Sequence, residues 1–209
     1  MNSKIVIALA ASAAVVVAGC AAMQGPTDPA LEAKAVEMMK VSFKEKGQAK
    51  LDRLNQDETQ AQCSIYTGRE LPKDVAEKIE RVNMATIKWP ADGKLVGDWK
   101  QGEKIAQEGR GFQYSDDPKG PSGANCYACH QLTRQEISYG TIGPSLYNFA
   151  KIRGFTDETG RYAWGKVFNS EAYNACSNMP RFGHNGILTE QQIRDVVALL
   201  VDPASPVNQ

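Results

Sequence analysis

The residues best placed to do chemistry form a Cys-Tyr-Ala-Cys-His run at positions 126–130. Two residues between the cysteines let both sulfur atoms reach the vinyl groups at one edge of a porphyrin, and the adjacent imidazole then lies under the iron. We therefore predict one haem c, bonded covalently to Cys126 and Cys129, with His130 as an iron ligand.

Two other chemistries of such a run are disfavoured. A structural zinc site needs four closed ligands, and the remaining His184, Cys63 and Cys176 show no second paired knuckle. A thioredoxin-like cysteine pair needs a strand followed by a helix, whereas the preceding residues 121–125 have the composition of a loop. Haem attachment is the interpretation that remains.

An iron that only carries electrons needs a sixth ligand that stays bound, because a vacant position binds oxygen, peroxide or small anions. Met179 is the candidate, since it lies in a loop shortly before the last predicted helix. A thioether ligand favours reduced iron and raises the potential. Three alternatives stay open: Met179 as a packing residue, His184 as the ligand, and Cys176 as the ligand or as a reactive thiol near the haem.

The first twenty residues predict export. Lys4 precedes an unbroken apolar run at positions 5–19, which is too short for a transmembrane helix and is typical of a signal peptide. The run ends in Val-Ala-Gly-Cys at 17–20, which resembles a bacterial lipobox. Cys20 is then either acylated, as a membrane anchor, or removed by ordinary cleavage just after it. Both interpretations place the mature protein in the periplasm.

The remaining cysteines predict a disulfide. With Cys126 and Cys129 assigned to haem and Cys20 lipidated or removed, Cys63 and Cys176 remain of the five. An even remainder in an oxidising compartment indicates that these two pair. The bridge would close a long segment of chain and restrict the unfolded state.

Composition and periodicity predict an all-α protein. The 24 basic residues balance 24 acidic ones without a cluster, so nucleic acid is not an expected partner. Residues 98–202 are predicted to form the haem domain, with a helix at about 98–109, a long looped middle and a last helix before Pro203. Thr189 and Gln192 match a capping box, and the apolar stripe after them should pack near Ile105. Residues 203–209 are a C-terminal tail.

A helical extension is predicted at residues 21–97, before the haem domain. The charged, Ala-rich stretch from 30 to about 58 should be largely helical, with Met38 and Met39 as packing residues on an apolar face. A second helix is predicted at 72–82, and Trp-Pro-Ala-Asp-Gly at 89–93 then breaks the chain.

Five further side chains have two open interpretations. Trp99, Trp164, Tyr147 and Phe182 either line the porphyrin or belong to ordinary core. Arg181 either faces a haem propionate or a partner protein, or is a solvated surface residue.

Residues 140–146, Gly-Thr-Ile-Gly-Pro-Ser-Leu, resemble the Gly-Pro-Xaa-Leu segment of class I cytochromes c. In that family the proline carbonyl accepts the N–H of the proximal imidazole, which fixes the orientation and basicity of the ligand. The resemblance gives this role to Pro144.

Several segments in order resemble the SoxX family, the monohaem cytochrome c subunits of the SoxAX complex in bacterial thiosulfate oxidation. They lie at residues 97–100, 125–130, 140–146, 179–186 and 202–208. The resemblance implies a class I cytochrome c domain with His130 and Met179 on the iron. It also implies a heterodimer with a SoxA-like cytochrome subunit, which joins thiosulfate to a cysteine of a SoxY-type carrier protein.

In such a complex this chain would relay electrons to a soluble cytochrome c and would have no catalytic residues of its own. Two alternatives stay open. One is a generic periplasmic monohaem carrier, and the other is a haem enzyme or sensor with an open iron position, against which Met179 argues.

Overall fold

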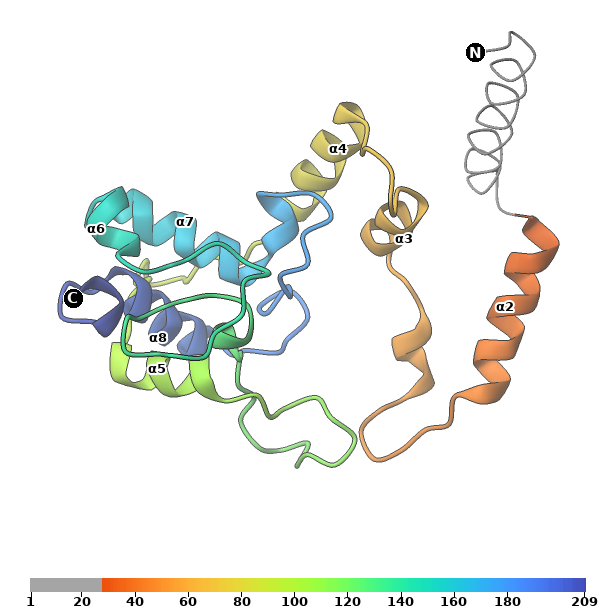
Figure 1. Ribbon diagram of the computed structural model, residues 1–209, viewed down its shortest axis with the longest axis horizontal. Coiled ribbons are helices and arrows are strands. Elements are labelled where there is room, and N and C mark those ends of the chain that lie inside the picture. Colours follow the sequence, from red (N-terminus) through yellow and green to blue (C-terminus); the bar gives the residue numbers. More distant parts are fainter. Residues whose placement is uncertain (1–27) are drawn as a thin grey trace, which may run out of the picture. The chain divides into compact units, whose positions relative to one another are not determined.

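A computed structural model describes residues 28–209 (Figure 1). The predicted signal peptide and Cys20 lie outside the described residues. The chain divides into two compact units, one ending at Lys44 and the other running from Glu45 to Gln209. Across residues 28–209, no helix is both long and apolar enough to cross a membrane.

The described part of the first unit is helix α2, Pro29–Ser42. The side chain of Asp28 accepts the backbone N–H of Ala30 at 2.9 Å, and a proline in the first turn costs no hydrogen bond. No residue of α2 is buried, and Met38 and Met39 are 61% and 40% exposed. The described part of the first unit therefore contains no packing partner for the predicted apolar face of this helix.

The second unit is helical, as predicted, and the described chain carries only one isolated β-bridge. Its α-helices are α3 (Glu58–Ile65), α4 (Lys73–Met84), α5 (Trp99–Gln107), α6 (Phe149–Arg153), α7 (Asp157–Phe168) and α8 (Glu190–Val201). Its 3₁₀ turns are η2 (Leu51–Leu54), η3 (Cys126–Ala128), η4 (Ser170–Ala172) and η5 (Pro206–Asn208).

The prediction of one largely helical stretch from 30 to about 58 was wrong between α2 and α3. Lys46 and Ala49 pair as a bridge around Gly47, whose φ of +52° is a left-handed conformation that favours glycine. This turn redirects the chain, and a new helix, α3, starts only at Glu58.

Helices α5 and α8 lie side by side and form the centre of the haem domain (Figure 1). Both halves of the predicted capping box of Thr189 and Gln192 are present, so α8 begins where the sequence indicated. The helices approach so closely that a Cβ on Gly102 would lie 2.0 Å from the backbone oxygen of Asp195. The predicted pairing of these helices is confirmed.

The predicted looped middle of the domain is present only from residue 108 to 148, where η3 is the one regular element, because α6 and α7 follow and α7 packs against α8. Thr156 caps α7 by accepting the backbone N–H of Thr159 at 3.2 Å. Trp164, 1% exposed, projects from α7 into the core and donates its indole N–H to the backbone oxygen of Lys88 at 3.0 Å.

Residues before position 97 contribute to this same core. Ile79 of α4 and Ile87 are 5% and 7% exposed, and α4 packs against η4. The boundary predicted at residue 97 therefore does not coincide with the structural division after Lys44. The segment from residue 45 to 97 folds as part of the unit that contains the haem domain.

The C-terminal residues are packed into the domain. Val207 and Asn208 are 0% and 1% exposed. The Asn208 side chain accepts the backbone N–H of Ala150 at 3.0 Å and donates to the backbone oxygen of Leu200 at 3.0 Å. The predicted tail thus joins α6 to the end of α8.

Candidate haem site

The Cys-Xaa-Xaa-Cys-His run forms a single tight turn. Cys126 begins the 3₁₀ turn η3, and its carbonyl accepts the backbone N–H groups of both Cys129 and His130, at 3.1 and 2.9 Å. Asn125 precedes the turn with φ of +47°, a conformation that asparagine tolerates better than most residues. The turn brings the two cysteines and the histidine together, and both cysteines are free thiols.

The electrostatics of Cys126 do not suit a redox-active pair. Burial, with a smaller contribution from the neighbouring Cys129, raises the pKa of its thiol to about 12. Reactive cysteines have a lowered pKa, because the thiolate is the nucleophile and the metal ligand. Among residues 28–209, moreover, no three His, Cys, Asp or Glu side chains cluster closely enough to hold a metal ion.

The imidazole of His130 is oriented by a hydrogen bond at its Nδ1 atom. Its Nδ1 lies 2.7 Å from the carbonyl oxygen of Pro144. Since a carbonyl only accepts, Nδ1 carries the proton and the lone pair of Nε2 is left for a metal. The position that the resemblance assigned to Pro144 is thus the one it occupies.

The loop that carries Pro144 is fastened to the haem motif by backbone hydrogen bonds. Gly140 donates to the carbonyl of Tyr127 at 2.9 Å, and Gly143 donates to that of Cys129 at 2.8 Å. A Cβ on Gly143 would lie 2.1 Å from Cε1 of His130. Only a glycine lets the loop approach the imidazole this closely.

Met179 lies in the loop between η4 and α8 and is partly buried against the hydrophobic core, as is Cys126. Its carbonyl accepts the Ser170 hydroxyl at 2.5 Å, and its backbone N–H donates to the Ser177 hydroxyl at 3.2 Å. The backbone at Met179 is therefore fixed on both sides of its side chain.

The predicted disulfide is present: the sulfur atoms of Cys63 and Cys176 are 2.07 Å apart. The alternative of a reactive Cys176 thiol is thereby wrong. The bridge joins α3 to the Met179 loop across 113 residues of sequence.

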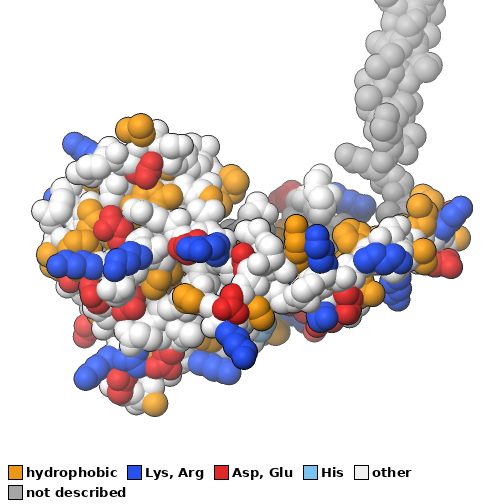
Figure 2. Space-filling view, turned by 90° about the horizontal axis from the view of Figure 1, so that it is seen from below, with side chains coloured by type: hydrophobic (Ala, Val, Ile, Leu, Met, Phe, Trp, Pro, Cys, Tyr) orange, Lys and Arg blue, Asp and Glu red, His pale blue; other side chains and the backbone are white. Residues whose placement is uncertain are grey.

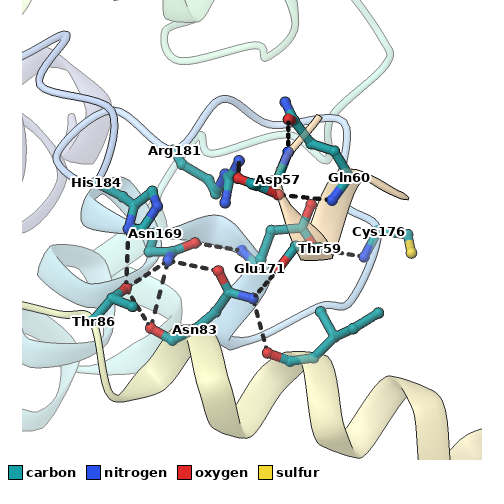
Figure 3. A network of polar contacts seen from close by, with 11 residues as sticks. Asp57, Thr59, Gln60, Asn83, Thr86, Asn169, Glu171, Cys176, Arg181 and His184 are labelled. Atoms are coloured by element: carbon teal, nitrogen blue, oxygen red, sulfur yellow. Dashed lines mark hydrogen bonds and ion pairs between the residues drawn. The ribbon is translucent and has the colours of Figure 1, made fainter. Parts of the chain in front are cut away.

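The interpretation of Arg181 as a solvated surface residue was wrong, because the residue is 7% exposed and forms an ion pair with Asp57 (Figure 3). His184 is exposed and its Nδ1 lies 3.2 Å from the hydroxyl of Thr86, which is the arrangement of an ordinary loop histidine. Although the residue as a whole is exposed, partial desolvation of the imidazole lowers the pKa of His184, and the positive charge of Arg181 also lowers it.

The aromatic candidates have different positions. Trp164 and Phe182 are 1% and 6% exposed within the core, and Trp99 is packed partly against it. Tyr147 lies near the C-terminus and donates its hydroxyl hydrogen to the backbone oxygen of Gln209 at 2.8 Å.

Sequence reasoning missed the polar network that surrounds Arg181 (Figure 3). Asp57 caps α3 in a capping box with Gln60, a local signal that the sequence does contain. Asn83 and Asn169, 2% and 0% exposed, bond to each other at 2.9 Å, and no local pattern indicates that pair.

Fold and site together define a class, a helical domain built around a covalent haem-attachment motif. Residues 100–202 match the family model "Cytochrome c". A curated protein of Aquifex aeolicus (strain VF5), described as an uncharacterized lipoprotein, is 36% identical over 218 aligned residues, covering 100% of both chains. The chain belongs to the cytochrome c family, and it is a haem protein of the electron-carrying type.

Proposed function

We propose that this protein is an exported monohaem electron carrier in which Cys126 and Cys129 hold the haem and His130 and Met179 are the axial ligands. The observation that carries the proposal is the 2.7 Å contact between His130 Nδ1 and the Pro144 carbonyl, beside two free thiols. This arrangement fits a haem, because the hydrogen bond at Nδ1 fixes the orientation of the imidazole and leaves Nε2 free to bind iron.

Each residue has a separate task. When bound, the haem supplies a one-electron iron couple, whose potential the axial ligands and their hydrogen bonds set. The hydrogen bond to Pro144 makes His130 a more basic ligand. The thioether of Met179 would hold the iron as its second protein ligand, and a ligand that stays bound would favour electron transfer over oxygen chemistry.

The sulfur-oxidation setting is the finer part of the proposal. The SoxX-like segments support a heterodimer with a SoxA-like cytochrome subunit, in which this chain passes electrons to a soluble cytochrome c. The face shown in Figure 2 carries basic, acidic and hydrophobic side chains interspersed, so partner recognition there rests on local contacts.

Co-purification tests this setting. Tagged protein from thiosulfate-grown cells should bring down a second haem-containing subunit, and adding a SoxY-type carrier and thiosulfate should reduce the haem of the complex. Protein that purifies without such a subunit would identify a generic carrier instead.

We also propose that Cys20 is acylated and anchors the protein to a membrane facing the periplasm. The lipobox-like residues 17–20 support this, and so does the lipoprotein description of the Aquifex relative. Intact mass measurement of the mature protein tests it: the expected mass includes one haem, acyl chains on Cys20 and one disulfide. A mature chain that starts after Cys20 would overturn the anchor.

A further inference from the structure

The loop that carries Met179 is held by residues from outside the matched segment 100–202 (Figure 3). On one side of Met179, Cys176 is bonded to Cys63 of α3. On the other side, Arg181 is paired with Asp57 at the start of α3. The backbone N–H of Ala175 also donates to Glu80 of α4 at 3.2 Å.

In the Arg181–Asp57 pair, a nearly buried guanidinium depends on a partly exposed carboxylate for its only ion pair among residues 28–209. The Arg181 side chain is 8% exposed and that of Asp57 is 42% exposed. A buried guanidinium that loses its partner leaves an uncompensated charge, which is strongly destabilising. The loop conformation that buries Arg181 is therefore favoured only while Asp57 lies opposite it.

The base of the loop is fixed by the same segment. Asn169 donates to Asn83 at 2.9 Å and to the hydroxyl of Thr86 at 2.8 Å. Thr86 also contacts His184 at 3.2 Å, beyond the far end of the loop. Residues near both ends of the loop thus bond to α4 or to the turn after it.

The backbone at Cys176 is also unusual. Its φ of +60° is a left-handed conformation that a non-glycine residue adopts only where its surroundings hold it. Glu171 accepts the backbone N–H of Cys176 at 2.6 Å, and the disulfide to Cys63 holds the side chain of Cys176.

We infer that residues 57–86 act as a strap that keeps the Met179 loop in its ligating conformation, with Asp57 and Arg181 as the positioning residues for the distal ligand. This inference rests on the proposed function, because it requires the sulfur of Met179 on the iron. Loops open locally with free energies below that of global unfolding, so fastening both ends slows the departure of a ligand carried between them.

The test measures imidazole binding to the oxidised, full-length holoprotein. Imidazole reaches the iron only after Met179 leaves, so its limiting rate at high imidazole concentration equals the rate of loop opening. The informative variant is D57N, because asparagine caps a helix as well as aspartate does and should keep the bond to the Gln60 N–H, 2.8 Å long in the native chain. The substitution removes both the negative charge and the acceptor oxygen that Asp57 presents to Arg181.

A control for the loss of a similarly exposed ion pair is D92N, in which Arg194 keeps its second partner, Glu190. Asp92 pairs with Arg194 of α8, and their side chains are 48% and 14% exposed, close to the values for Asp57 and Arg181. That pair lies away from the Met179 loop. We expect D57N to raise the limiting rate by about tenfold, since the lost pair is partly buried, and D92N to leave the rate unchanged.

A conservative variant and a second site complete the test. R181K keeps the positive charge, so its limiting rate of imidazole binding should lie closer to the native rate than that of R181M. Should D57N fail to assemble with haem, the C63S/C176S double variant tests the same strap and should also open faster. Equal rates in the native, D57N and C63S/C176S proteins would overturn the strap. A native protein without a Met-to-iron charge-transfer band would instead overturn the proposed function.

Discussion

The Nδ1 atom of His130 lies 2.7 Å from the carbonyl oxygen of Pro144, and Gly143 lies against the face of the same ring. The orientation of the imidazole therefore depends on the loop that carries Pro144, which leaves no space for a side chain at position 143.

Replacing Gly143 by alanine is expected to displace the imidazole, because the added Cβ would lie 2.1 Å from Cε1 of His130. G143A should yield less haem-loaded protein, with an altered low-spin spectrum. The control is G160A in α7, where the nearest atom to a new Cβ is 3.9 Å away. That helix substitution should stabilise the protein by about 0.5–1 kcal/mol and leave the haem spectrum unchanged. A native spectrum for G143A would contradict this account.

Removing the disulfide is expected to lower global stability. The bridge joins residues 113 apart, and closing a segment of this length restricts the unfolded chain. C63S/C176S should lose about 2–5 kcal/mol of unfolding free energy, measured by denaturant titration with the haem in place. A midpoint equal to that of the native protein would show that the bridge adds nothing to stability.

The C-terminal residue Asn208 is expected to matter as much as a core residue. Its buried amide makes hydrogen bonds to both α6 and α8, so N208A leaves several backbone groups unpaired. We expect a loss of about 2–3 kcal/mol in unfolding free energy, against almost no change for Q209A, whose side chain is exposed. Similar midpoints for the two variants would mean that the C-terminus is not part of the folded core.

Features of the fold that depend on residues close together in the sequence could be predicted, and those that depend on residues far apart could not. The start of α8 depends on Thr189 and Gln192, three residues apart, and both halves of its capping box are observed. Helix α7 was missed because Gly160 and Gly165 lower its intrinsic helix propensity. Packing against α8 and Tyr173 decides its conformation instead.

The distal side of the site shows the same limit. The disulfide followed from counting cysteines, but the pair of Asp57 and Arg181 joins residues 124 apart in the chain. No periodicity links such residues, and a buried arginine runs against the usual preference of that side chain for the surface. Only the folded chain shows that the extension reaches the Met179 loop.

Stability should fall as the pH is lowered from 7 to 5. His184 has a pKa below its ordinary value of 6.5 in the folded protein, because of partial burial and the nearby Arg181. Below about pH 6.5 the unfolded chain therefore binds a proton that the folded chain does not, which favours unfolding. With His130 on the iron, His184 is the remaining histidine of the two in the sequence. H184N should flatten this pH dependence, and an unchanged slope would assign it to another group.

The central claim is that His130 and Met179 close both axial positions of a covalently bound haem iron. The most direct measurement is the Met-to-iron charge-transfer band in the absorption spectrum of the oxidised protein, recorded for the native chain, for M179A and for M84A, whose methionine is 40% exposed on α4. The account predicts the band in the native protein and in M84A, and its loss in M179A together with carbon monoxide binding to the reduced iron. A native protein that lacks the band and binds carbon monoxide readily would contradict it.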